Sequence, residues 1–179
     1  MSVKLADLDG DHKPDLVSAS LDTFTVFLNL GHGTFAPGVG YAISGNGVIG
    51  GFFDFAIGDL TADGKPEIVV LPNGADALSL FLNQGDGSFV QDVYLPTSGG
   101  PFGALVVDLN EDGRGELFVT SLSSMFVLLN EGAPFFAAPI RYADGYDAPL
   151  FAADFNGDGK PDIVFWGGVL VNTTPWPSR

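Results

Sequence analysis

The sequence contains no cysteine in 179 residues, which excludes disulfide bonds and thiolate metal sites. It has only seven lysine and arginine residues, too few to form the basic surface that binds nucleic acid. No uncharged apolar run reaches the roughly 18 residues of a membrane-spanning helix. Convincing helical periodicity is also lacking, and 25 glycines with 12 prolines disfavour long helices. These absences favour a globular chain of short strands and turns.

The chain instead repeats one nine-residue phrase four times. The copies are DLDGDHKPD from Asp7, DLTADGKPE from Asp59, DLNEDGRGE from Asp108 and DFNGDGKPD from Asp154. Their starts lie 52, 49 and 46 residues apart. An apolar run follows each copy, and a second run ends at Asn29, Asn83, Asn130 or Asn172. In the first three units a glycine-rich turn then leads to an aromatic residue, at Phe35, Phe89 and Phe136.

This repeat predicts an all-β fold of β-propeller blades, each with four antiparallel strands. The 179 residues form a single propeller or partial-propeller domain of about four blades, the last incomplete, over about 3–46, 52–99, 102–145 and 148–177. The first strand of each blade is expected before the phrase, at Val3–Ala6, Phe55–Gly58, Ala104–Val107 and Leu150–Ala153. The fourth strand is expected to start at the aromatic residue, with at most a stub near Trp176 in the last blade.

The phrase has the donor pattern of a calcium loop. Oxygen-bearing side chains stand at positions 1, 3, 5 and 9, where a tight turn directs them into one cavity, and such an all-oxygen set suits Ca²⁺ better than Mg²⁺ or Zn²⁺. Position 7 adds a backbone carbonyl, from Lys13, Lys65, Arg114 and Lys160. An EF-hand is excluded because position 12 carries Ser18, Val70, Val119 and Phe165 instead of glutamate. The alternative is a hydrogen-bonded turn without metal, which leaves three or four acids to repel one another.

The copies differ at two positions that matter. At position 6 we expect left-handed backbone, and three copies have glycine there: Gly64, Gly113 and Gly159. The first copy has His12 at this position, which we interpret as a turn residue. Position 3 of the second copy is Thr61, a neutral and weaker donor, so the site at Asp59 is expected to bind most weakly. Thirteen of the 22 acidic residues lie at the loop positions, so the charge of −15 reflects metal chemistry more than a partner.

With these loops and their flanking runs, the sequence from about Val3 to Asn172 resembles FG-GAP (VCBS-type) repeats. This family forms the blades of the integrin α-subunit head, of bacterial surface proteins and of propeller lectins. The resemblance implies a propeller, usually of seven blades, with one Ca²⁺ in each loop and up to four per chain. By position, the implied side-chain ligands are Asp7, Asp9, Asp11, Asp15, Asp59, Thr61, Asp63, Glu67, Asp108, Asn110, Asp112, Glu116, Asp154, Asn156, Asp158 and Asp162.

The blade count departs from the family and predicts a homo-oligomer, such as a two-chain ring of about eight blades. The resemblance implies that ligands bind between blades or on the face opposite the loops. The connections on that face contain Asp22, Asn46, Asn73, Asp76, Asp144, Tyr146, Asp147 and Trp166. An aromatic ring beside amides and acids suits a sugar, although turns favour Asn and Asp for backbone reasons alone. Phe35, Phe89 and Phe136 are expected to pack between blades.

The predicted function is therefore a calcium-binding recognition module for a carbohydrate or a surface protein. One alternative is an enzyme such as a polysaccharide lyase, but the sequence has no nucleophile elbow, P-loop or zinc motif. A second alternative is a self-assembling propeller fragment without its own ligand. We expect no nucleic-acid partner and an extracellular, cell-surface or periplasmic location, where Ca²⁺ is abundant. No signal peptide precedes the first repeat, which suggests that upstream sequence was removed.

Overall fold

The computed structural model describes residues 2–20, 22–43, 52–72, 77–96, 100–121, 124–133, 136–143, 151–165 and 168–173. Within these ranges the chain forms strands, turns and loops, and no helix is present. Accordingly, none of the described segments is a helix able to cross a membrane. The fold is an all-β propeller arrangement of four antiparallel sheets, as predicted.

Blades 1 and 2 are four-stranded antiparallel sheets. Blade 1 has the strand order β1 (Ser2–Ala6), β2 (Asp15–Ser20), β3 (Thr23–Phe27) and β6 (Val39–Ala42). Blade 2 has the order β7 (Phe52–Gly58), β8 (Glu67–Pro72), β9 (Ala77–Asn83) and β10 (Phe89–Pro96). A small separate hairpin joins β4 (Asn29–Gly31) to β5 (Thr34–Phe35).

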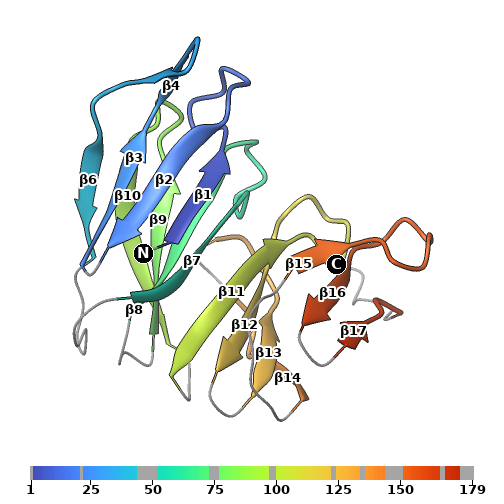
Figure 1. Ribbon diagram of the computed structural model, residues 1–179. Helices are drawn as coiled ribbons and strands as arrows, with labels where there is room; N and C mark the ends of the chain where they lie inside the picture. The colour runs from blue at the N-terminus through green and yellow to red at the C-terminus, as the bar shows by residue number, and fades with distance from the viewer. Residues whose placement is uncertain are drawn as a thin grey trace.

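Blade 3 is four-stranded, and blade 4 has three strands within the described residues. Blade 3 has the order β11 (Pro101–Val107), β12 (Glu116–Ser121), β13 (Met125–Leu128) and β14 (Ile140–Ala143). Blade 4 has the order β15 (Phe151–Ala153), β16 (Asp162–Phe165) and β17 (Gly168–Leu170). The expected stub near Trp176 lies outside the described residues. Figure 1 shows the four blades in a row, with blades 1 and 4 at its ends.

The outer strands differ from the prediction in two blades. In blade 2 the fourth strand does start at Phe89. In blade 1 Phe35 belongs to the small hairpin, and the fourth strand starts only at Val39. In blade 3 Phe136 forms an isolated bridge, and the fourth strand starts at Ile140. Pro37 and Pro139 explain the difference, because proline has no N–H to continue a ladder.

The core consists of three clusters, one between each pair of neighbouring blades. Phe89 packs in the cluster between blades 1 and 2, and Phe136 packs against the one between blades 2 and 3. Phe35 is 43% exposed, so its expected place in the core is wrong. Glycine permits the closest approach of blades 2 and 3: a Cβ at Gly58 would lie 2.4 Å from Val106 Cγ1.

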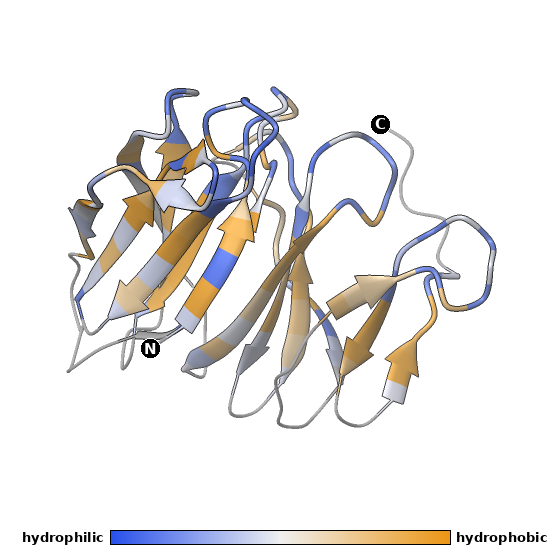
Figure 2. Ribbon diagram, turned by 45° about the horizontal axis from the view of Figure 1, so that its top comes forward, coloured by the Kyte–Doolittle hydropathy of each residue, from blue (hydrophilic) through white to orange (hydrophobic). Residues whose placement is uncertain are grey.

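All four repeated phrases form the loop between the first and second strands of their blades. In Figure 2 these loops are hydrophilic and lie at the same end of the sheets, while the strands are mostly hydrophobic. The strands β8 and β12 are buried at every residue because interior blades have a neighbour on both faces. The fold thus places four equivalent acidic loops on one side of a continuous apolar stack.

Candidate metal sites

The aspartate at position 1 organises each loop. Asp7 accepts the N–H of Gly10 at Oδ1 and the N–H of His12 at Oδ2, both at 2.8 Å. The other three aspartates likewise accept the position-6 N–H at Oδ2, at distances of 2.8 to 2.9 Å: Asp59, Asp108 and Asp154. A carboxylate that accepts several backbone N–H groups holds the turn closed. Position 1 therefore shapes the loop whether or not it also binds a cation.

Two left-handed residues turn the loop backbone inward. The expected left-handed residues at position 6 are confirmed, including His12 with φ 64°. Position 4 is left-handed as well. Glycine occupies it in two loops, at Gly10 and Gly157, but Ala62 and Glu111 occupy it in the other two, with φ 60° and 61°. The sequence pattern did not reveal this second left-handed position. Non-glycine residues rarely adopt this region. The hydrogen bonds to the position-1 aspartate offset that strain.

The side chains at positions 3 and 5 take part in local turns. At position 5 each aspartate accepts the N–H of the residue at position 7: Asp11, Asp63, Asp112 and Asp158. Asp11 also pairs with the ammonium group of Lys13, and this bond holds the pKa of Asp11 below its usual range. In loops three and four the position-3 amide donates to the position-5 carboxylate, from Asn110 at 3.3 Å and from Asn156 at 3.0 Å.

The acid at position 9 joins the loop to the third strand. Asp15 is fully buried, and it accepts the N–H of Leu8 at 2.8 Å and the N–H of Asn29 at 2.7 Å. Asp162 makes the same two bonds in blade 4, to Phe155 and Asn172. Glu67 and Glu116 accept the corresponding N–H groups in blades 2 and 3. This residue therefore has a structural role that the ligand pattern alone did not indicate.

The first loop brings three carboxylates together. One oxygen from each of Asp7, Asp9 and Asp15 lies within 4.8 Å of the others. Among the described residues this is the only group of three or more acidic or histidine side chains that meets this distance, since loops two to four each have a neutral residue at position 3. Asp11 is outside the group because it pairs with Lys13. The convergence of three anionic oxygens suits a divalent cation.

Burial and like charge act on the two glutamates. Burial raises the pKa of Glu67 to about 7, the N–H bond from Leu60 opposes the rise, and the carboxylates of Asp59 and Asp63 add to it. The pKa of Glu116 also rises to about 7, for the same reasons. A bound cation would reverse this effect, because it favours the ionised form of each acid around it.

Loop two contains a buried hydroxyl at a ligand position. Thr61 Oγ1 is buried and makes no hydrogen bond of good geometry among the described residues, although it interacts with the carboxyl group of Asp63. Thr61 stands at position 3, where the pattern requires a ligand oxygen, so a cation in the loop would satisfy it. Together with the all-oxygen donors of the loop, this poorly paired hydroxyl fits a hard cation.

Asparagines connect neighbouring blades through these loops. The side chain of Asn83 donates to the carbonyl of Leu8 in blade 1 at 3.0 Å and to that of Pro66 at 3.1 Å. Asn130 donates in the same way to Leu60 in blade 2 at 2.7 Å. The sequence showed these asparagines as recurring strand ends, and their role across the junction emerges only from the structure. Asn172 completes the set by donating to Leu109 of blade 3 at 2.8 Å.

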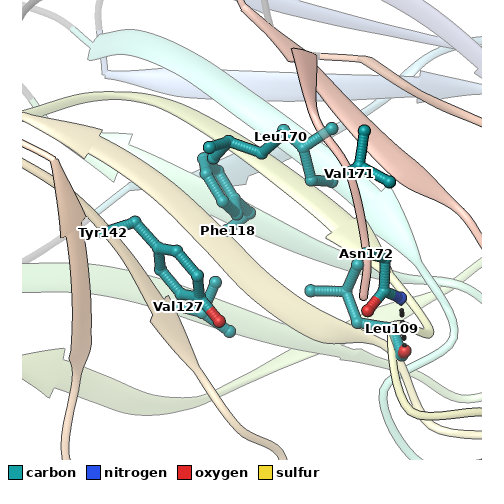
Figure 3. Close-up of a pocket in the computed structure, with 8 residues that line it drawn as sticks. Leu109, Phe118, Val127, Tyr142, Leu170, Val171 and Asn172 are labelled. Carbon is teal, nitrogen blue, oxygen red and sulfur yellow. Dashed lines mark hydrogen bonds between the residues drawn. The ribbon is translucent and has the colours of Figure 1, made fainter. Parts of the chain in front are cut away.

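A pocket opens between blades 3 and 4. Figure 3 shows the ring of Tyr142 beside Phe118 and Val127, with Leu170 and Asn172 contributed by blade 4. The ring centroids of Tyr142 and Phe118 are 6.4 Å apart. The same region between blades 1 and 2 is filled, because Phe89 lies edge-on to Tyr41 with centroids 5.7 Å apart. The pocket therefore offers an apolar recess with a half-exposed aromatic wall.

Most of the predicted ligand contacts on the opposite face lie outside the described residues. These are Asn46, Asn73, Asp76, Asp144, Tyr146, Asp147 and Trp166. Asp22 is described and is exposed; its carboxylate accepts the hydroxyl of Thr23 at 3.1 Å, and its carbonyl accepts the N–H of Ile43. These bonds give Asp22 a place in a turn.

The profile of the FG-GAP-like repeat matches three overlapping ranges of the chain, 7–70, 59–119 and 108–165. No curated protein sequence matches the chain. A similar solved structure is that of an Agrocybe aegerita lectin, described as recognising non-reducing terminal N-acetylglucosamine, with 24% identity and a TM-score of 0.64. The match covers 90% of this chain and 45% of the lectin.

A second similar structure is the pore of the Photorhabdus luminescens Tc holotoxin, with 24% identity and a TM-score of 0.59. That match covers 91% of this chain and 8% of the toxin chain. The chain thus spans less than half the length of either protein. At this level of identity the two structures support the fold alone.

Proposed function

Because the chain belongs to the FG-GAP-like repeat family, we propose that it is a calcium-binding propeller unit that serves as a recognition module for a carbohydrate or a surface protein. The observation that carries the proposal is the convergence of Asp7, Asp9 and Asp15 in a loop whose donor pattern recurs in every blade. The proposed location is extracellular, cell-surface or periplasmic, where Ca²⁺ reaches the level that such modules need.

In this proposal each loop holds one Ca²⁺ through the side chains at positions 1, 3, 5 and 9 and the carbonyl at position 7. The ion supplies positive charge that offsets the repulsion among the acids. The chain supplies the scaffold: position 1 closes the turn, and position 9 fixes the loop to the third strand through two backbone N–H groups. Because the folded loop binds the ion and the unfolded chain does not, Ca²⁺ stabilises the fold.

A binding role is favoured over catalysis by the engagement of the acids. The buried carboxylates of Asp15 and Asp162 each accept two backbone N–H groups, which suits support of the fold better than proton transfer. Asp54, outside the loops, pairs with Lys4 of blade 1 at 3.3 Å. The competing function is a polysaccharide lyase, and the release of fragments with an unsaturated uronate at the new non-reducing end from an acidic polysaccharide would identify it.

The recess between blades 3 and 4 has a volume of about 30 Å³, too small to enclose a sugar, and it is the exposed ring of Tyr142 in its wall that favours a carbohydrate as the ligand. Sugars stack their apolar faces on aromatic rings, and Tyr142 presents such a ring at 38% exposure. The similar Agrocybe aegerita structure is described as recognising N-acetylglucosamine, which makes glycans with that terminal sugar the first ligands to test. A surface protein that binds the same recess is the other possible ligand.

A glycan array with and without Ca²⁺ tests this function. We expect retention of glycans ending in N-acetylglucosamine in Ca²⁺ and its loss in EDTA. Tyr142→Ala should weaken binding about tenfold, whereas Phe35→Ala, which removes an exposed ring from the small hairpin, should leave binding unchanged. Binding that is unaffected by Tyr142→Ala would exclude the pocket, and an array without any bound glycan would exclude the carbohydrate ligand.

The proposed function also includes self-association. The apolar side chains Val3 and Leu5 of blade 1 and Phe151 and Val169 of blade 4 are 43% to 62% exposed on the two ends of the row. Exposed apolar faces of this kind mark interaction surfaces. A second copy of the chain is therefore the proposed partner, and the mass of the particle in solution tests it.

A further inference from the structure

Every internal junction between blades is built from the same two parts. The first is an apolar side chain at loop position 2, and Leu8, Leu60 and Leu109 are at most 3% exposed there. The second is the asparagine of the next blade, which donates its side-chain N–H to the carbonyl of that leucine. Three junctions repeat this arrangement, so each blade carries one part on each side.

The two ends of the row each present one unused part. In blade 4 the residue at loop position 2 is Phe155, and it is 52% exposed. In blade 1 the corresponding asparagine is Asn29, which donates to the carbonyl of Pro14 at 2.9 Å within its own blade. Among the described residues Asn29 has no hydrogen bond to another blade. A Phe155 carbonyl and an Asn29 amide are therefore left in the positions that pair at every internal junction.

The outward face of blade 1 repeats the face that blade 2 buries. Leu5 stands two residues before its loop, as Ile57 does in blade 2, and Val3 stands four residues before it, as Phe55 does. Phe55 is fully buried against blade 1. Val3 and Leu5 are 52% and 62% exposed. Blade 1 thus has the surface with which a blade packs on its predecessor.

The outward face of blade 4 repeats the face that blade 1 buries. Val164 corresponds to Val17, because each stands two residues after the position-9 acid of its blade. Val169 corresponds to Val26, because each stands three residues before the strand-end asparagine. Val17 and Val26 lie in the core between blades 1 and 2, whereas Val169 is 43% exposed. Blade 4 thus has the surface with which a blade packs on its successor. The two outward faces are complementary halves of one junction.

We infer that a second copy of this chain docks head to tail, with blade 4 of each copy packed on blade 1 of the other. The inference rests on the proposed self-association and specifies its surfaces. Phe155 becomes buried as Leu8 is, and Asn29 donates to the Phe155 carbonyl of the partner. Such a heterologous contact forms a closed particle when its rotation closes, and two copies then make two equivalent junctions and leave neither face exposed.

Sedimentation equilibrium of the full chain in Ca²⁺ provides the first measurement. We expect a particle of twice the 18.7 kDa chain mass. Phe155→Asp alters the blade 4 face but also adds a charge to the fourth loop, so Val169→Asp, outside the loop, is made as a second blade 4 variant; Leu5→Asp alters only the blade 1 face. Each should raise the dimer dissociation constant at least about tenfold, because a charge then enters the apolar junction. Leu30→Asp, at a 62% exposed position in the small hairpin, is the matched control and should leave the dimer intact.

Mixing the two variants separates head-to-tail docking from other contacts. Each variant retains one normal face, so an equimolar mixture of Phe155→Asp and Leu5→Asp should form a heterodimer with one intact junction. Circular dichroism of every variant checks that the blades remain folded, and Asn29→Ala gives a second, milder change at the same junction. Asn29→Ala should weaken the dimer without altering its stoichiometry.

The outcomes distinguish two failures. A wild-type chain that is monomeric in Ca²⁺ overturns both the self-association and this mode of docking. A dimer that resists either Phe155→Asp or Leu5→Asp overturns the head-to-tail mode alone, because a face-to-itself contact of blade 1 or blade 4 would be sensitive to only one variant. Larger particles that respond to both variants would retain the junction and replace the two-chain closure with a larger ring or a filament.

Discussion

The interior blades and the end blades share one repeat but have different surroundings. Strands β8 and β12 of blades 2 and 3 are buried throughout, whereas β15 of blade 4 is exposed at both its ends. At loop position 2, Leu60 is fully buried and Phe155 is 52% exposed. The repeat therefore specifies the shape of a blade, while the neighbouring blade determines which of its apolar residues become buried in the core.

The acid at loop position 9 also differs between interior and end blades. Glu67 and Glu116 occupy it in the interior blades, and Asp15 and Asp162 occupy it in the end blades. All four accept the N–H of the residue at loop position 2, and all four are buried. The interior blades thus meet the same hydrogen-bonding demand with a side chain one methylene longer.

Removal of calcium should cause the largest effect and should act on interior and end blades alike, because every loop then contains uncompensated carboxylates. A site loaded at 100 times its dissociation constant contributes about 2.7 kcal/mol to the free energy of unfolding. Calorimetric melting with and without EDTA measures the loss. Added Ca²⁺ should restore the melting temperature, and the same concentration of Mg²⁺ should restore it less. A melting temperature that EDTA leaves unchanged would remove calcium from the function.

The pH dependence in EDTA should come mainly from the interior blades. Burial raises the pKa of Glu67 and Glu116 from 4.5 to about 7. The folded protein therefore holds protons that the unfolded chain releases, so this stabilisation is complete below about pH 4.5 and is lost as the pH rises through about 7. Urea unfolding of the metal-free protein at several pH values measures it. The double variant Glu67→Gln, Glu116→Gln should flatten the profile, and an unchanged slope would contradict the assignment.

Truncation at loop position 2 compares a buried and an exposed copy directly. Leu60→Ala should lower the free energy of unfolding by about 2 to 5 kcal/mol, because it leaves a cavity between blades 2 and 3. Phe155→Ala should cost less than about 1 kcal/mol when the protein is dilute enough to be monomeric. Urea unfolding of both variants at low concentration gives the two values. Equal losses would mean that Phe155 is buried in the monomer.

The strand-end asparagines allow the same comparison between a buried and an exposed position, with polar side chains and a smaller expected effect. Asn130→Ala should cost about 2 to 3 kcal/mol, because the buried carbonyls of Leu60 and Gly115 lose their donor. Asn29→Ala removes the bond to the carbonyl of Pro14 and the bond from the N–H of Gly31, both at a more exposed site, and should cost about 1 kcal/mol. The melting temperatures of the two variants in the same buffer measure the difference. A larger loss of stability in Asn29→Ala than in Asn130→Ala would mean that the bonds of Asn130 across the interior junction contribute less than expected.

The smallest expected effect distinguishes the loop of blade 2 from that of blade 1. At position 3 Thr61 offers a neutral hydroxyl, whereas Asp9 offers a charged carboxylate, so site two should bind Ca²⁺ about tenfold more weakly than site one. Calorimetric titration of variants that each retain a single site ranks the four loops. Thr61→Asp should strengthen site two, and a ranking that places site two as the tightest would contradict the argument.

Much of the scaffold could be predicted from the sequence because its signals are local. The repeat spacing, the position-6 turn and the ends of the first strands all depend on residues close in the chain, and Ala6 and Gly58 end β1 and β7 as expected. The fourth strands were harder, since Pro37 and Pro139 end the ladder that the aromatic residue suggested. Ala62 and Glu111 also gave no local sign that they are left-handed.

Features that depend on neighbouring blades could not be predicted in this way. Phe35 and Phe89 occupy the same place in the repeat, yet Phe35 is 43% exposed and Phe89 is 6% exposed. The bond from Asn130 to Leu60 joins residues 70 positions apart, which no periodicity reveals. Sequence reasoning on the candidate sites identified the donors but not the burial of the Thr61 hydroxyl oxygen, because burial arises only in the folded loop.

The hydrogen bonds of the loops and junctions form one continuous line through the molecule. In blade 1 the N–H of Leu8 is bound by Asp15, and its carbonyl accepts Asn83 of blade 2. The carboxylate of Glu67 accepts the backbone N–H of Asn83 and also that of Leu60, whose carbonyl accepts the side chain of Asn130. The same series of hydrogen bonds continues through Glu116 and Leu109 to Asn172 and Asp162. Such an array has nearest-neighbour cooperativity. An ion that orders one loop therefore lowers the cost of ordering the next, and calcium titration of the whole chain should be steeper than the sum of its single sites.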